Sequence, residues 1–190
     1  MPDETRATRP MPRRMETGWQ AWLATVGYIA SHFSPDALLK IEAAPGEESP
    51  LAWSATISWG STLERVLDCA ALSAALDSLW GEVTRSHRIF ETLEDAARSP
   101  AGYDDGEWFD LPTQDILHRL TWSLHNLFKG DEWRLVIVYH PTEVAELRVQ
   151  TRVLAPVKGV QVGGRGASLL NATRDLFRNL AARYDDHSET

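Results

Sequence analysis

The order strand, strand, strand, helix occurs twice in this chain, and it restricts the possible folds more than any other feature. In residues 133–184 these elements are predicted at residues 133–140, 145–154, 157–164 and 168–184. In residues 37–83 they are predicted at residues 37–43, 51–59, 64–68 and 72–83, in the same order but without evident sequence identity between the two segments. We therefore expect an α+β fold with two similar β-β-(β)-α units. Their antiparallel sheets lie side by side or fuse, and helices cover one face.

The third strand of the earlier unit is open to two interpretations. Ser61 and Glu64 have the spacing of a capping box, which would begin a helix. The apolar residues around Val66, however, do not join the helical phase that starts at Leu72. A strand at residues 64–68 is the preferred prediction, and a helix is the alternative.

Length and composition indicate one domain between two tails. Residues 1–14 contain three prolines and little to bury, so they are predicted to be a disordered tail, as are residues 186–190. Residues 15–185 are predicted to form a single α+β domain, in which residues 84–128 are a helical insert between the two units.

Two further helices can be predicted from their starting residues. Thr17 can cap a helix whose apolar residues recur at helical spacing up to Phe33. Pro112 suits the first turn of a helix whose core face begins at Leu117. The residues Ser99 to Leu111 that precede it are acidic and aromatic, which predicts a loop.

Composition excludes several classes of protein. No apolar run approaches the roughly 20 residues that span a bilayer, and no apolar stretch follows the arginines near residue 1, so we expect neither a membrane segment nor a secretory signal. The single cysteine, Cys69, rules out an internal disulfide and suits a reducing cytosol. A cytoplasmic protein is expected.

The net charge of −8 is unevenly divided along the chain. Residues 133–184 carry eight Lys and Arg against three Asp and Glu, a balance of +5, which leaves −13 elsewhere. The acidic total argues against a general nucleic-acid binder, although a basic unit could still meet a polyanion. The simpler interpretation is that oppositely charged regions attract one another, within the chain or across a dimer.

The later unit resembles HicB-type antitoxin domains. The resemblance rests on residues 133–140, on the V-Q-V-G-G-R-G of residues 160–166, and on Leu169-Leu170-Asn171-Ala172 with Leu176-Phe177. It covers about 50 residues, with a fainter copy at residues 37–83. It implies a sheet covered by a helix and a capacity to bind other proteins. No DNA-binding segment follows the unit, and residues 84–128 have no counterpart in the family.

The strongest candidate site is a basic sheet face in the later unit. Strand alternation would place Arg148, Gln150 and Arg152 together, with Arg134 and His140 beside them. Spaced arginines can hold phosphate or carboxylate through paired hydrogen bonds. The predicted site for an anion or a partner comprises Arg134, Arg148, Gln150, Arg152, Lys158 and Arg165. The alternative is a solvated or protein-covered face without a specific ligand.

The glycine-rich residues 162–168 lie between a predicted strand and a predicted helix. Backbone N–H groups at such a point can cradle an anion, but the segment lacks the Lys-Ser/Thr of a phosphate-binding loop. The favoured interpretation is that glycine permits a turn with positive φ angles.

The loop before Pro112 supplies a second candidate. Tyr103, Trp108 and Phe109 stand among carboxylates and could anchor a protein partner, unless they fold back into the core. His118 and His125 share a helix stripe but lie two turns apart, too far to chelate a metal as neighbours. We expect the stripe to line a helix contact.

These observations favour a non-catalytic cytosolic interaction or regulatory module that binds protein partners or itself, with no membrane contact. No catalytic residue, metal site or cofactor is predicted, because no known catalytic motif occurs. One alternative is an RNA- or phosphate-binding domain that uses the basic unit. Another is a metal-assisted enzyme that works from His118, His125 and the acidic loop.

Overall fold

The computed structural model describes residues 15–46, 50–87 and 99–185. Its α-helices are α1 (Gly18–His32), α2 (Leu72–Ser86), α4 (Leu111–Leu127) and α5 (Leu169–Asp185). Its strands are β1 (Leu38–Ala44), β2 (Ala52–Trp59), β3 (Thr62–Cys69), β4 (Arg134–Tyr139), β5 (Val149–Ala155) and β6 (Val160–Gly166). Three single 3₁₀ turns lie at Asp105–Glu107, Ala145–Leu147 and Pro156–Lys158.

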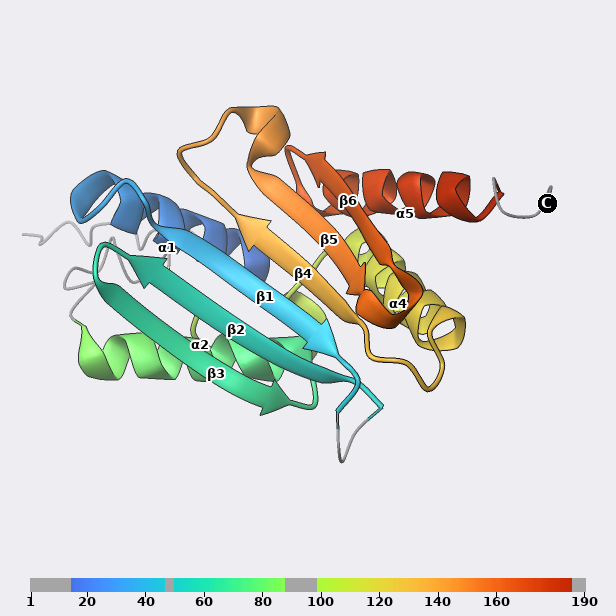
Figure 1. The fold of residues 1–190 in the computed structure, drawn as a ribbon. Coiled ribbons are helices and arrows are strands. Elements are labelled where there is room, and N and C mark those ends of the chain that lie inside the picture. The colour runs from blue at the N-terminus through green and yellow to red at the C-terminus, as the bar shows by residue number, and fades with distance from the viewer. Residues whose placement is uncertain (1–14, 47–49, 88–98, 186–190) are drawn as a thin grey trace, which may run out of the picture.

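The six strands form one antiparallel sheet in the order β3-β2-β1-β4-β5-β6 (Figure 1). β1 and β4 pair at its centre, with Ile41 opposite Ile137, so the sheets of the two units are fused. The elements run β1-β2-β3-α2 and then β4-β5-β6-α5, which confirms the predicted α+β fold. Descent of the two units from one ancestral repeat stays a prediction.

The helices pack on one face of this sheet, and Figure 1 views the molecule from the opposite face. Burial follows the period of two that a half-covered sheet requires. In β1, Leu39, Ile41 and Ala43 are buried beneath the helices, and the residues between them are only partly covered. In β2, Trp53 and Trp59 lie at the two ends of the buried row, as their alternation predicted.

The helix starts follow the capping residues that the sequence supplies. Thr17 accepts a hydrogen bond from the Gln20 N–H, and the Gln20 side chain accepts one from the Thr17 N–H in return, which completes a capping box. Asp110 caps α4 through the Thr113 N–H, with Pro112 in the first turn. Both predicted helices are therefore confirmed. Among the described helices, none is long and apolar enough to cross a membrane.

Several predicted boundaries need correction. The disputed third strand is a strand and is longer than predicted, Thr62–Cys69. β5 begins only at Val149, because Ala145–Leu147 form a 3₁₀ turn that ends the preceding loop. Residues 88–98, which belong to the predicted helical insert, lie outside the described residues, as do both predicted tails.

The glycine-rich segment is a strand rather than a turn. Gly164 and Gly166 lie in β6 and face α5, and neither has a positive φ angle. A Cβ on Gly164 would overlap the backbone of Leu176 and Ala172, and one on Gly166 would approach the Ala172 nitrogen to 2.8 Å. Glycine is needed here because α5 packs directly on the strand backbone, which corrects the predicted reason.

The aromatic residues of the loop before α4 belong to the core. Trp108 is 1% exposed and lies against Gly18 of α1, where an added Cβ would meet its ring at 2.6 Å. Tyr103 and Phe109 are buried with it. Apolar burial of these rings explains the arrangement, so the prediction of an exposed partner-binding loop is wrong and the folded-back alternative is correct.

Candidate functional site

The face of the sheet opposite the helices, here called the open face, carries most of the charge of the strands. We define it by the strand residues that point away from the helices. Its charged members are Lys40, Glu42, Arg65, Asp68, Arg134, Arg152 and Arg165. Five cations thus stand against two carboxylates, on a protein whose net charge is −8.

One row of residues crosses the open face from edge to edge. In strand order it consists of Arg65, Thr56, Lys40, Val138, Gln150 and Arg165, each opposite the next. Five strand spacings separate its ends, or roughly 24 Å of sheet. A cation therefore stands at each edge and another at the centre.

Glu42 holds the cations of the first unit and of β4 together. Its carboxylate lies 3.0 Å from the Lys40 Nζ, 3.5 Å from the Arg134 Nη1 and 3.9 Å from the Arg65 Nη2. A hollow of about 240 Å³ lies beside it, with Asp68 on its lining. One carboxylate shared among three cations orders their side chains but leaves them with excess positive charge.

A second hollow, of about 340 Å³, lies at β5 and β6 and contains Gln150, Arg152 and Arg165. The Arg152 Nη2 donates to the Gln150 Oε1 at 3.4 Å. Asp175 of α5 also lines the hollow, but its carboxylate accepts from the Arg165 backbone N–H at 3.1 Å and from Arg178 at 3.3 Å. Within the described part of the chain, neither guanidinium in this hollow forms an ion pair.

Two predicted members of the site lie elsewhere. Arg148 precedes β5, and its Nε donates to the Glu143 carbonyl at 3.1 Å. Lys158 lies in the turn before β6 and pairs with Asp131 at 3.3 Å. The other four predicted residues, Arg134, Gln150, Arg152 and Arg165, do lie on the open face.

The sequence interpretation missed the contribution of the first unit. Lys40 and Glu42 alternate with buried Leu39 and Ile41, so their place on an outward face was readable from the period of two. Arg65 was not assigned because the segment around it was undecided between strand and helix. The antiparallel pairing of β1 with β4 then brings these residues beside Arg134.

The chemistry of the open face suits binding of acidic groups. Guanidinium groups donate paired hydrogen bonds to carboxylates and phosphates. Between the cations lie apolar residues, among them Val136, Val138 and Leu154. No aromatic residue of the described strands points to this side; Tyr139 pairs with Leu39 on the helix side. The face can therefore form salt bridges and apolar contacts but offers no ring for base stacking.

The residues considered for an enzyme come together only in part: His118 and Asp105 of the acidic loop line one hollow, and His125 lines another. His118, Trp122 and His125 point outward from α4, with Trp122 65% exposed, so the predicted helix contact along this stripe is wrong. Burial, with the nearby Asp68 carboxylate, raises the pKa of the Cys69 thiol, which disfavours a reactive thiolate. In the described ranges, no three His, Cys, Asp or Glu residues are grouped as metal ligands would be.

Comparison with models of protein families, with curated proteins and with solved structures found no match. No relative therefore assigns a role to the open face.

Proposed function

We propose that the protein is a binding module that docks an acidic segment of a partner protein on the open face of its sheet. One observation carries the proposal: the sheet face that no described helix covers has five cations and two carboxylates, Glu42 and Asp68. The charge of the rest of the chain is strongly negative, so this distribution is local to the face. Complementary charge of this kind directs association and selects the partner.

The mixture of side chains favours a protein over a nucleic acid. Val136 and Val138 lie next to Arg152 and Lys40 in the paired strands. Such alternation of apolar and cationic residues complements a protein surface that carries both carboxylates and apolar groups. Single-stranded RNA is usually held by stacking of bases on aromatic rings, which the described open face does not supply.

Fluorescence anisotropy with two labelled probes of equal charge tests the proposal. One is a 20-residue peptide of alternating Glu and Val, and the other is a single-stranded oligouridylate. We expect the peptide to bind more tightly than the RNA. The double variant Lys40→Glu with Arg152→Glu should weaken peptide binding by at least tenfold, because two attractions become repulsions. The matched control is Arg85→Glu with Arg119→Glu, which reverses two exposed helix arginines away from the open face.

Two results would count against the proposal. Tighter binding of the RNA, with an affinity that falls steeply as salt rises, would favour the RNA- or phosphate-binding alternative. Equal weakening by the open-face variant and the control variant would mean that the peptide senses only net charge.

The wider setting of this function also belongs to the proposal. A cytosolic location is supported by the single cysteine, which suits a reducing compartment. A second copy of the chain could also supply the acidic groups that bind the open face. Sedimentation velocity at micromolar concentration measures such self-association. Kinship with HicB-type domains remains a prediction, and the proposed docking does not depend on it.

A further inference from the structure

The two outer strands of the sheet, β3 and β6, differ in how their free edges are protected. Along β6, side chains of α5 reach the outer backbone groups: Asp175 accepts from the Arg165 N–H, and Asn179 donates to the Gly163 carbonyl at 2.7 Å. Arg183 donates to the Gly159 carbonyl just before the strand, at 3.0 Å. These bonds occupy groups to which another strand would pair.

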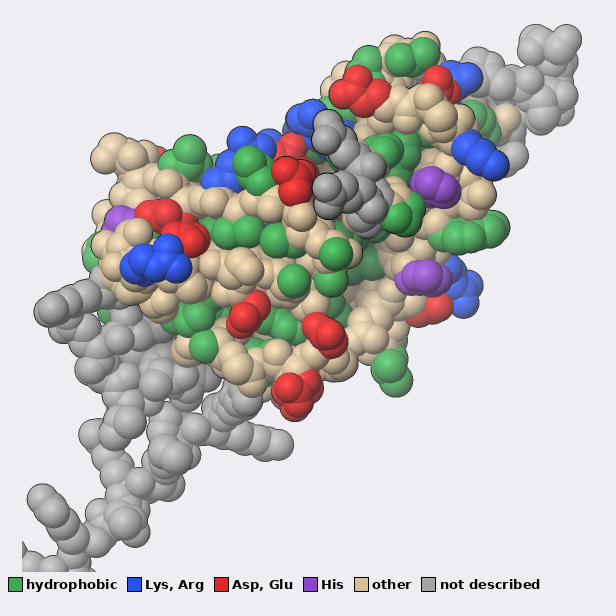
Figure 2. Space-filling view, turned by 90° about the horizontal axis from the view of Figure 1, so that it is seen from below, with side chains coloured by type: hydrophobic (Ala, Val, Ile, Leu, Met, Phe, Trp, Pro, Cys, Tyr) green, Lys and Arg blue, Asp and Glu red, His purple; other side chains and the backbone are tan. Residues whose placement is uncertain are grey.

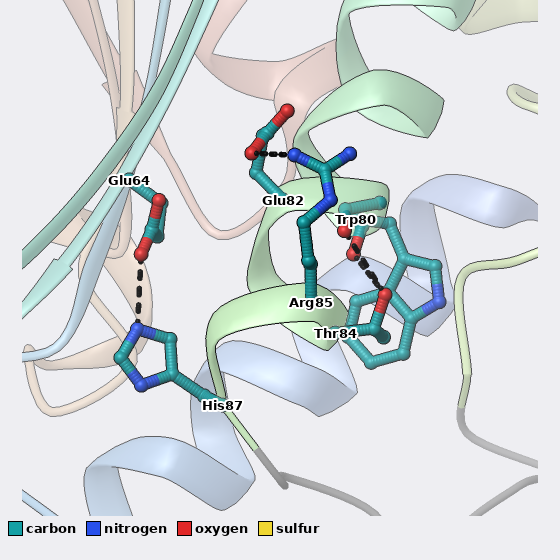
Figure 3. A network of polar contacts seen from close by, with 7 residues as sticks. Glu64, Trp80, Glu82, Thr84, Arg85 and His87 are labelled. Atoms are coloured by element: carbon teal, nitrogen blue, oxygen red, sulfur yellow. Dashed lines mark hydrogen bonds and ion pairs between the residues drawn. The ribbon is translucent and has the colours of Figure 1, made fainter.

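The corresponding helix beside β3 gives no such protection. Figure 3 shows two polar contacts within α2: Arg85 pairs with Glu82 at 2.6 Å, and the Thr84 hydroxyl donates to the Trp80 carbonyl. Glu64 of β3 points toward the helix end and meets the His87 Nε2 at 3.0 Å. Ser73, near the start of α2, donates to Asp105 instead, so none of these hydroxyl or guanidinium groups is directed to the β3 backbone.

The pairing of β3 with β2 shows which backbone groups are free. The two-residue turn of Gly60 and Ser61 is closed by the pair Trp59 and Thr62. In an antiparallel ladder, hydrogen-bonded and non-hydrogen-bonded pairs alternate from such a closing pair. Leu63 and Arg65 therefore direct their N–H and C=O groups away from β2, toward the free edge.

The same stretch presents a distinctive side-chain pattern on the open face. Leu63 is 64% exposed, Leu67 is 51% exposed, and Arg65 lies between them with half of its side chain exposed. Figure 2 views the molecule from the side of β3 and α2 and shows exposed hydrophobic side chains among charged ones there. The order apolar, cationic, apolar is the same in either chain direction. A parallel and an antiparallel added strand would therefore need the same complementary order of side chains.

A second copy of this chain does not suit the edge. Antiparallel pairing of β3 with itself about a two-fold axis centred on Arg65 would set Arg65 opposite Arg65. Centring it on Glu64 would set Glu64 opposite Glu64, and a ladder centred on Val66 would run into the irregularity between Val66 and Cys69. Like charges directly opposite one another destabilise a ladder, so each register that uses most of the strand is disfavoured.

We propose that the acidic partner adds a strand to the β3 edge, with residues in the order apolar, any, acidic, any, apolar. Its acidic residue lies opposite Arg65, and its two apolar residues lie beside Leu63 and Leu67. The backbone hydrogen bonds supply affinity, and the side-chain pattern supplies selection. This inference rests on the proposed function, since it states how the partner of the open face is held.

Three heptapeptides test the inference by fluorescence anisotropy. The first is Thr-Val-Thr-Asp-Thr-Val-Thr, the second has Lys in place of Asp, and the third is the Asp peptide with alternate amides N-methylated. We expect wild-type protein to bind only the first. Arg65→Glu should weaken that binding by roughly tenfold and reverse the preference toward the Lys peptide, because cross-strand charges select their opposite.

A matched pair of proline variants tests the backbone contacts. Leu63→Pro removes an N–H that points to the free edge and no bond to β2, so binding of the Asp peptide should be lost. Gln161→Pro makes the same change in an outward-facing residue of β6 and should leave binding unchanged. Thermal unfolding of each variant shows that the fold persists, and Arg65→Glu gives an independent answer where a proline variant unfolds.

The outcomes separate this inference from the proposed function. If the N-methylated peptide binds as well as the parent and Leu63→Pro changes nothing, the partner lies across the face and strand addition is wrong. If Arg65→Glu has no effect on the heptapeptide but the Lys40 and Arg152 double variant still loses the 20-residue peptide, only the docking edge is misassigned. If neither variant affects any acidic peptide, both proposals fail. Dimerisation that Leu63→Pro abolishes would assign the edge to a second copy.

Discussion

The edges at β3 and β6 end the same sheet and follow the same order of elements, yet only β6 is closed by its own helix. β6 turns Gly164 and Gly166 toward α5, and β3 turns Glu64 and Val66 toward α2. Without side chains in the way, α5 settles on the strand backbone, and its Asp175, Asn179 and Arg183 reach around the edge. Side chains on the hidden side of an edge strand therefore decide whether the edge stays free.

The largest effect is expected from Gly164→Ala, which would disturb the close packing of α5 on β6 that distinguishes the two edges. The added methyl group would overlap the backbone of α5, so the variant should lose about 3 kcal/mol of unfolding free energy, as strong overpacking does. Urea unfolding measures the loss. Gly163→Ala is the matched control: its Cβ would meet the Thr151 carbonyl oxygen at 3.4 Å and the Arg152 Cγ at 3.7 Å, so a change within about 1 kcal/mol is expected. Equal effects would show that α5 does not depend on the glycine.

Asn179→Ala should make the β6 edge resemble the β3 edge. It removes the 2.7 Å hydrogen bond to the Gly163 carbonyl, which should cost about 1 kcal/mol in urea unfolding. Hydrogen exchange should quicken at the Arg165 amide as the cap loosens. Asn171→Ala is a suitable comparison, since its side chain lies beside Gly166 but forms no hydrogen bond to the described β6 backbone. Unchanged exchange at Arg165 would contradict the cap.

Glu42→Gln tests how much the Glu42 carboxylate reduces the positive charge of the open face around β1. Lys40, Arg65 and Arg134 would lose their shared carboxylate, at a cost of about 0.5 kcal/mol in unfolding free energy. Affinity for the acidic 20-residue peptide should rise by roughly threefold. The control Glu82→Gln removes the same charge from α2, where it pairs only with Arg85. An equal gain in the control would mean that net charge alone governs binding.

The smallest effect concerns Asp36, which holds the turn between β2 and β3. Hydrogen bonds from the Ser34 hydroxyl and the Gly60 N–H lower the pKa of this carboxyl below its usual 3.8. A lowered folded-state pKa means that the ionised carboxylate contributes stability above the unfolded value, and that this contribution is lost as pH falls through the folded value. Asp36→Ala should therefore be less stable than wild type at pH 7, and the difference in unfolding free energy should shrink as the pH falls below 3.8. A difference that does not shrink with falling pH would exclude the charge as its cause.

Residue pattern alone predicted much of the fold. The alternation in β2 and the helical spacing after Thr17 and Pro112 mark the elements, because burial on one side imposes a period of two on strands and 3.6 on helices. The helix at Ser168 was placed correctly for the same reason. The segment from Thr62 to Cys69 was less certain, because an edge strand with exposed leucines lacks a clean buried row.

The chain order could not show which strands become neighbours. Pairing of β1 with β4 is a contact between residues about 96 positions apart, and no local pattern encodes it. That pairing places Arg134 beside Glu42, and so joins the basic residues of the two units on one face. The burial of Trp108 against Gly18 is likewise a long-range contact. The acidic residues around Trp108 are typical of an exposed loop, so the sequence did not indicate this contact.

By itself the sequence determined the elements, their hidden and outward sides, and the basic character of the later unit, since these depend on local periodicity and charge. Only the tertiary structure decided that two sheets become one, that Gly164 and Gly166 serve close packing, and that α5 caps the β6 edge with hydrogen bonds that have no described counterpart at Arg65. Each of those outcomes depends on how closely distant backbones approach, and distance in space is set by packing rather than by neighbouring letters.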